Sequence, residues 1–118
     1  MMTFEQELEL ILATMSVEQL KFFQRNLEVG NIITYSYWYG ECGCVYGHAA
    51  RTEDMLCDTQ IGNAAWKLRE SLGADHSVDG YTVVERTLLQ KVSPGDLNLT
   101  NPLLWDISTA VSKELATR

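Results

Sequence analysis

The chain has 118 residues, of which 46% are hydrophobic and 21% charged, and its formal net charge is −7 at pH 7. This length and composition fit a single globular domain spanning residues 1–118 and exclude a disordered chain. The acid excess disfavours direct binding of DNA or RNA, because nucleic-acid-binding proteins need basic residues to neutralise phosphates.

The first segment, "MMTFEQELELILATM", predicts an amphipathic helix. Thr3 and Gln6 have the spacing of a capping box, and apolar residues recur on one helical face. Acidic residues stand where a signal peptide needs a basic region, and the apolar residues are not continuous, so the segment predicts neither a signal peptide nor a membrane span. We therefore expect a cytoplasmic protein with reduced cysteines and no membrane partner.

A second helix is predicted to follow almost without a loop. Ser16 and Gln19 repeat the capping box, and Gly30 is placed to end the helix. The next segment, residues 31–41 ("NIITYSYWYGE"), is rich in β-branched and aromatic residues but alternates imperfectly. It predicts an ordered extended segment or loop packed on the helices. The alternative is a small α+β domain in which "IITYSYWY" pairs with "YTVVE" at residues 81–85.

Four more segments carry helix signals. Small residues at 44–51 predict a short helix, and Asp58 is placed to cap a helix that ends at Leu72, before Gly73. Residues 81–91 predict another helix, "SPGD" at 93–96 a turn, and Asn101 with Pro102 the start of a last helix. The sequence thus predicts an all-α fold of five to six helices, with an aromatic-rich irregular segment after the second.

Several aromatic residues lie away from the apolar stripes. At about 100° per residue, Phe22, Trp66 and Trp105 fall far from the stripes of their own helices. Either the helices are buried on two sides, or these rings form a surface for a protein partner or for a second copy of the chain. We expect a homodimer or partner interface that uses these rings or the aromatic cluster of Tyr35, Tyr37, Trp38 and Tyr39.

The stretch "GECGCVYGHAAR" at residues 40–51 holds two of the three cysteines and one of the two histidines. With the third cysteine, it has the inventory of a Cys3His zinc site, formed by Cys42, Cys44, His48 and Cys57. Cys44 and His48 are four residues apart, which places them on one face of a helix. A structural zinc site is one hypothesis, although the usual Cys-x2-Cys spacing is absent.

Two other interpretations of the same stretch stay open. The cysteines can act as small buried hydrophobes, with Gly43, Gly47 and the alanines allowing close packing. Alternatively, Cys44 with His48 or with His76 could form a nucleophile–base pair of a thiol enzyme. No loop that would stabilise an oxyanion and no phosphate-binding glycine motif is visible in the sequence, so we expect no catalytic residues.

The same residues carry a resemblance. "CGCVYGHAA" at residues 42–50 resembles the Cys-Gly-x-x-x-Cys-x-x-Gly-x-Ala signature of small, mostly uncharacterised phage and bacterial helical proteins, and "AAWKLRESLG" at 64–73 resembles a later part of them. The resemblance implies a helical fold, a phage or prokaryotic source and a packing role for the cysteines. It implies no catalytic residue.

Together these observations predict a small acidic interaction protein without catalysis. The resemblance suggests that it is phage-encoded. Its small acidic domain, the aromatics away from the apolar stripes and the lack of catalytic groups suggest that it acts on a host protein. The alternatives are a zinc-stabilised domain and a thiol-dependent enzyme. We expect no cofactor, with zinc as the one possible exception.

Overall fold

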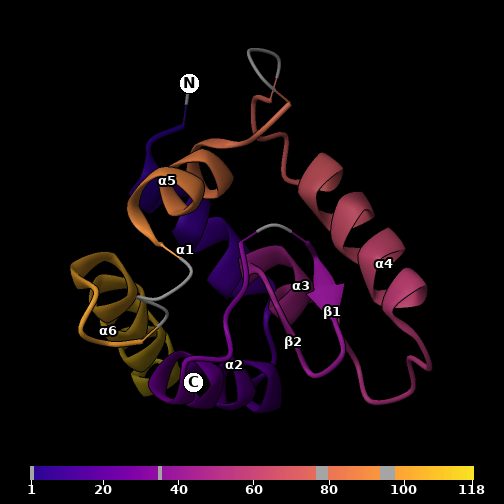
Figure 1. Cartoon of the computed structure of the whole chain (residues 1–118), viewed down its shortest axis with the longest axis horizontal. Helices are drawn as coiled ribbons and strands as arrows, with labels where there is room; N and C mark the ends of the chain where they lie inside the picture. Colours follow the sequence, from indigo (N-terminus) through magenta and orange to yellow (C-terminus); the bar gives the residue numbers. More distant parts are fainter. Residues whose placement is uncertain (1, 35, 77–79, 94–97) are drawn as a thin grey trace.

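A computed structural model describes residues 2–34, 36–76, 80–93 and 98–118. Within these ranges the chain forms six α-helices and one short antiparallel hairpin (Figure 1), which confirms the predicted helical fold. The helices, in chain order, are α1 (Phe4–Thr14), α2 (Val17–Val29), α3 (Val45–Ala50), α4 (Asp58–Ser71), α5 (Val83–Lys91) and α6 (Pro102–Ala116). The hairpin pairs β1 (Trp38–Tyr39) with β2 (Cys42–Gly43).

The predicted helix ends are largely confirmed, because local hydrogen bonds form them. The Thr3 hydroxyl accepts a 3.1 Å bond from the Gln6 amide, and Ser16 does the same for Gln19. Gly30 ends α2 with a left-handed φ of 78°, a conformation that residues with a Cβ rarely adopt. Asn101 caps α6, whose first residue is Pro102.

Two predicted helix starts were wrong by one or two residues. Asp58 is the first residue of α4, and Cys57 occupies the cap position without a side-chain hydrogen bond. The helix expected from residue 81 starts at Val83, because Thr82 and Glu85 form a third capping box. The turn expected at 93–96 lies mostly outside the described residues.

The segment after α2 is extended and packs on the helices, as predicted. Its hairpin partner is the chain immediately after it: Trp38 lies opposite Gly43, and Tyr39 opposite Cys42. Ile32 makes a further parallel bridge to Gly43. The alternative pairing with residues 81–85 is wrong, because Val83 to Glu85 form the first turn of α5.

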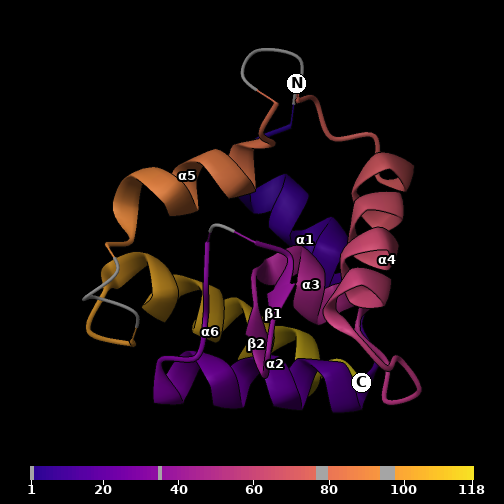
Figure 2. The same cartoon turned by 45° about the vertical axis from the view of Figure 1, so that its right-hand side comes forward.

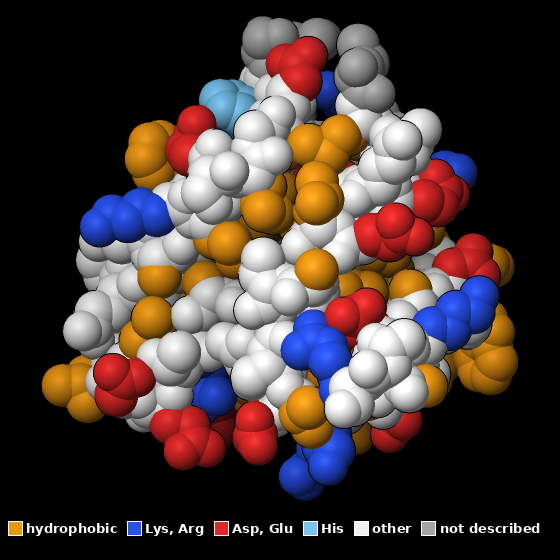
Figure 3. Space-filling view, turned by 180° about the vertical axis from the view of Figure 1, so that it is seen from behind, with side chains coloured by type: hydrophobic (Ala, Val, Ile, Leu, Met, Phe, Trp, Pro, Cys, Tyr) orange, Lys and Arg blue, Asp and Glu red, His pale blue; other side chains and the backbone are white. Residues whose placement is uncertain are grey.

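The helices surround the short α3, which packs against α1, α2 and α4 (Figures 1 and 2). α6 lies against α1 and α2, while α5 packs on α1. The buried core draws on every helix and includes Ile11, Leu20, Phe23, Val45, Tyr46, Ala65, Val84, Leu88, Leu104, Ile107 and Val111. Figure 3 shows that acidic and basic side chains are interspersed on one face of the molecule.

Candidate binding pocket

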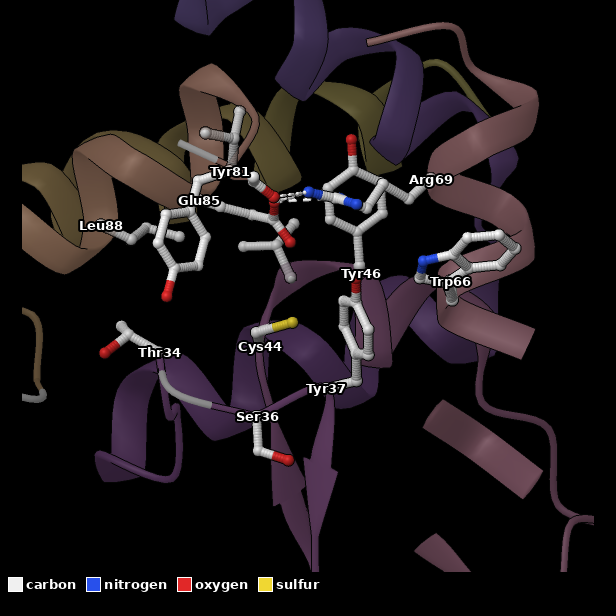
Figure 4. A pocket seen from close by; sticks show the side chains of 13 residues that line it. Thr34, Ser36, Tyr37, Cys44, Tyr46, Trp66, Arg69, Tyr81, Glu85 and Leu88 are labelled. Carbon is white, nitrogen blue, oxygen red and sulfur yellow. Dashed lines mark hydrogen bonds and ion pairs between the residues drawn. The ribbon is translucent and has the colours of Figure 1, made fainter. Parts of the chain in front are cut away.

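A pocket of about 340 Å³ lies between α4, α5 and the segment that precedes β1 (Figure 4). Residues from distant parts of the sequence line it. They are Thr34, Ser36, Tyr37, Cys44, Val45, Tyr46, Trp66, Arg69, Gly80, Tyr81, Val84, Glu85 and Leu88. In Figure 4, Trp66 on α4 and Tyr81 before α5 stand on opposite sides of the pocket. Both rings are substantially exposed, at 52% and 46%.

A largely buried ion pair joins the two helices that flank the pocket. Arg69 on α4 is 5% exposed, and its Nε and Nη2 lie 3.0 and 2.9 Å from Oε1 of Glu85 on α5. Nη2 also donates to the Gly80 carbonyl, and Nη1 lies 3.6 Å from Oε1 of Glu70. The same Glu85 oxygen accepts a 2.9 Å hydrogen bond from the Thr82 amide. The charged pair therefore fixes α5 relative to α4.

Two weakly acidic side chains that line the pocket, those of Cys44 and Tyr37, are held in their neutral forms. Burial raises the pKa of the Cys44 thiol to about 12. Burial, followed by the nearby Glu85 carboxylate, raises the pKa of Tyr37 to about 12. Both groups are therefore protonated at neutral pH, and Cys44 lacks the thiolate that nucleophilic catalysis requires.

His48 is buried in an aromatic cage rather than facing the pocket. Its ring lies 4.9 Å from that of Trp38 and 5.0 Å from that of Phe23, measured between centroids. Because a carbonyl only accepts, Nδ1 donates to the Cys44 carbonyl at 3.0 Å, and Nε2 accepts from the Asn26 amide at 2.8 Å. Burial lowers the pKa of His48 to about 4, so the ring is neutral.

The residues of the predicted zinc site occupy different surroundings. Cys44 is buried beside the pocket, Cys42 is half-buried in β2, and Cys57 is exposed before α4. Both ring nitrogens of His48 are engaged in hydrogen bonds. Within the described ranges, no group of three or more His, Cys, Asp or Glu residues is arranged to hold a metal ion. Zinc binding stays a prediction that elemental analysis can test.

The glycines of the same stretch allow the chain to approach α3 closely. A Cβ placed on Gly47 would lie 1.8 Å from the Tyr37 carbonyl oxygen, and one on Gly43 would lie 2.2 Å from the same atom. The Cys44 amide donates to that oxygen at 3.2 Å. The stretch therefore packs as a small-residue face against residues 37–38, which is one of the interpretations drawn from its sequence.

The predicted interface aromatics divide into three groups. Trp66, Tyr39 and Trp105 are exposed, at 52%, 67% and 58%. Tyr37 and Phe22 are half-buried, and the Phe22 ring lies beneath the Arg51 guanidinium at 4.7 Å. Trp38 lies inside the molecule, 5% exposed, because the hairpin turns its ring onto His48. Tyr35 lies outside the described residues.

Sequence reasoning missed Arg69, Tyr81 and Glu85 as pocket residues. A signal for Arg69 was present, since it continues the buried i, i+4 row of Ile61 and Ala65 on α4. A charged residue in such a row indicates a buried ion pair. Glu85 could have been found as the N3 residue of the capping box that begins at Thr82. The contact between the two helices had no local signal.

Comparisons with protein-family models, with curated proteins and with solved structures found no match to this chain. Within the described residues, every helix is too short or too polar to cross a bilayer.

Proposed function

We propose that this protein is a non-catalytic binding module that docks a partner protein over the pocket between α4 and α5. The single observation that supports the proposal is the pairing of a concave, largely apolar pocket with two exposed aromatic rings at its mouth, Trp66 and Tyr81. Aromatic residues beside a pocket are typical anchors of protein interfaces, because binding removes much of their apolar surface from water at low entropic cost.

The chemistry of the pocket favours binding over catalysis. Its thiol, Cys44, has a pKa of about 12 and is therefore protonated at neutral pH. The imidazole closest in sequence, His48, uses Nδ1 to bind the Cys44 carbonyl and Nε2 to bind Asn26. Neither group is poised as the nucleophile or the base of a thiol enzyme.

The test compares two exposed tryptophans, one inside the pocket and one outside. Immobilised wild type, Trp66→Ala and Trp105→Ala are exposed to a bacterial lysate, the source that the resemblance to phage and bacterial proteins suggests. A retained protein is purified, and its affinity for each variant is measured by calorimetry. We expect wild type and Trp105→Ala to bind alike, and Trp66→Ala to bind at least about 30-fold more weakly, as for an interface anchor.

Equal binding of the retained protein to wild type and Trp66→Ala would contradict docking at this pocket. Circular dichroism of all three proteins provides the folding control. Both rings are more than half exposed, so we expect either substitution to leave the helical spectrum unchanged.

A further inference from the structure

The pocket offers a free hydrogen-bond acceptor from a carboxylate. Oε1 of Glu85 is occupied by Arg69 and by the Thr82 amide. Oε2 makes no hydrogen bond to any residue that the structure describes, and Figure 4 shows it directed into the pocket, on the side of Cys44. The hydroxyl of Tyr37 likewise has no hydrogen-bond partner among the described residues, and it points into the same space.

The positive charge beside this acceptor is already compensated. Arg69 directs Nε and Nη2 at Glu85 and the Gly80 carbonyl, and its Nη1 lies 3.6 Å from Oε1 of Glu70. The charge of Arg69 is thus balanced by that of Glu85, the other charged residue that lines the pocket. An occupant that donates hydrogen bonds and carries positive charge therefore fits Oε2 of Glu85 better than an anion, which this carboxylate oxygen would repel.

The geometry also favours the ammonium of a lysine over the guanidinium of an arginine. A guanidinium binds a carboxylate best through two parallel hydrogen bonds, one to each oxygen. Arg69 already holds one oxygen of Glu85, so a second guanidinium would find only the other. An ammonium is a compact donor that needs one strong acceptor and can give its other hydrogens to neighbouring hydroxyls, here that of Tyr37.

The walls of the pocket suit the rest of a lysine side chain. Val84 and Leu88 provide apolar surface for a hydrocarbon stem, and the rings of Trp66 and Tyr81 flank the entrance. Aromatic faces attract an ammonium directly, and long basic side chains bury their stems while the charge keeps polar contacts. The chain's net charge of −7 also attracts a basic surface at long range.

We propose that the pocket takes the side chain of a lysine on the partner protein, with its ammonium on Oε2 of Glu85. This inference rests on the proposed function and names the group that the module recognises. Three probes of one size test it on the whole protein: n-butylammonium, n-butanol and butyrate. Each is titrated into ¹⁵N-labelled protein, and binding is followed by the indole N–H signal of Trp66.

We expect saturable binding of n-butylammonium, with n-butanol at least about tenfold weaker because it lacks the charge, and butyrate weaker still. Glu85→Gln should also weaken n-butylammonium at least about tenfold. This variant keeps an oxygen for the Thr82 amide, since glutamine also closes a capping box. Glu28→Gln makes the same charge change at an exposed position of α2, and this variant should bind n-butylammonium like wild type.

Should Glu85→Gln fail to fold, the variant Trp66→Ala and its control Trp105→Ala replace it. Binding to both is then followed by the backbone amide signals of residues 80–88, because Trp66→Ala lacks the indole signal. Only Trp66→Ala should lose n-butylammonium. Equal affinities for n-butylammonium and n-butanol, or no saturation by n-butylammonium, would overturn the lysine inference. So would retention of the partner from a lysate whose amines have been acetylated.

A partner whose binding still depends on Trp66 in those cases leaves the docking proposal standing. A partner whose binding does not depend on Trp66 overturns the docking proposal itself.

Discussion

The hydroxyl of Tyr46 donates a 2.6 Å hydrogen bond to Oε2 of Glu7, and both side chains are fully buried. Oε1 of Glu7 accepts a 3.1 Å bond from the Val84 amide, in the first turn of α5. One carboxyl group of α1 thus holds α3 and α5 together directly beneath the pocket. A buried polar group of this kind must keep its partners, because an unsatisfied one costs more than the bond itself contributes.

Tyr46→Phe should lower the free energy of unfolding by about 1–3 kcal/mol, because it leaves Oε2 of Glu7 buried without its donor. Urea denaturation followed by circular dichroism measures the loss. Tyr39→Phe is the matched control: Tyr39 is 67% exposed, and removing its hydroxyl should change the stability by less than about 0.5 kcal/mol. Equal effects of the two substitutions would contradict the buried network.

The stability of the protein should fall on mild acidification because of His48. Burial lowers the pKa of His48 to about 4, against about 6.5 in an unfolded chain. Between these two values His48 is protonated in the unfolded state and neutral in the folded state, so acidification favours unfolding. Stability is therefore fully present above about pH 6.5 and is lost progressively toward pH 4. Between pH 7.5 and pH 5 the contribution of His48 should be about 2 kcal/mol.

The measurement is a series of urea denaturations at pH 7.5, 6.5, 5.5 and 5. His48→Gln should flatten the pH dependence, whatever it does to the stability at pH 7.5. His76→Gln changes the half-exposed histidine and should keep the part of the slope that comes from His48. A wild-type slope in His48→Gln would show that another group is responsible.

Two glycine substitutions should have opposite effects. Gly47→Ala places a methyl group 1.8 Å from the Tyr37 carbonyl oxygen, which is backbone and cannot rotate away, so it should destabilise the protein by about 2–3 kcal/mol. Gly62 lies within α4, and a Cβ there meets no atom within 4 Å. Gly62→Ala should therefore stabilise the protein by about 0.5–1 kcal/mol through helix propensity. Thermal unfolding of both variants checks the pair, and a harmless Gly47→Ala would contradict the close approach.

The three cysteines should react with iodoacetamide in the order of their exposure and thiolate content. Cys57 is exposed and should be alkylated first. Cys42 should follow, because burial and the nearby Asp58 and Glu41 carboxylates raise its pKa. Cys44, whose pKa is about 12, should react only after denaturation. Peptide mass spectrometry at timed intervals gives the three rates. Rapid alkylation of Cys44 in the folded protein would favour the thiol-enzyme alternative.

The homodimer predicted from the off-stripe aromatics has a specific test at Trp105. This ring is 58% exposed on α6 and lies outside the pocket. Covering an indole removes about 150–250 Å² from water, which favours association through such a surface. We expect sedimentation velocity at micromolar concentration to show a dimer, and Trp105→Ala to sediment as a monomer with an unchanged helical spectrum. A monomeric wild type would contradict the prediction.

The sequence by itself determined the helices. Thr3, Ser16 and Asn101 begin helices because their side chains bind amides only two or three residues away, and Gly30 ends one through its own backbone freedom. The exposure of Trp66 and Trp105 was also predictable, since it follows from their angle to the apolar stripes. All of these properties depend on residues within one or two helical turns.

The tertiary structure alone decided the pocket and the fate of the residues near it. Trp38 became buried and His48 neutral because the hairpin packs over α3 and removes both rings from water. The Arg69–Glu85 pair brings together residues 16 positions apart that lie on two different helices. Desolvation and long-range contacts depend on how the helices pack, and a single sequence pattern does not encode that packing locally.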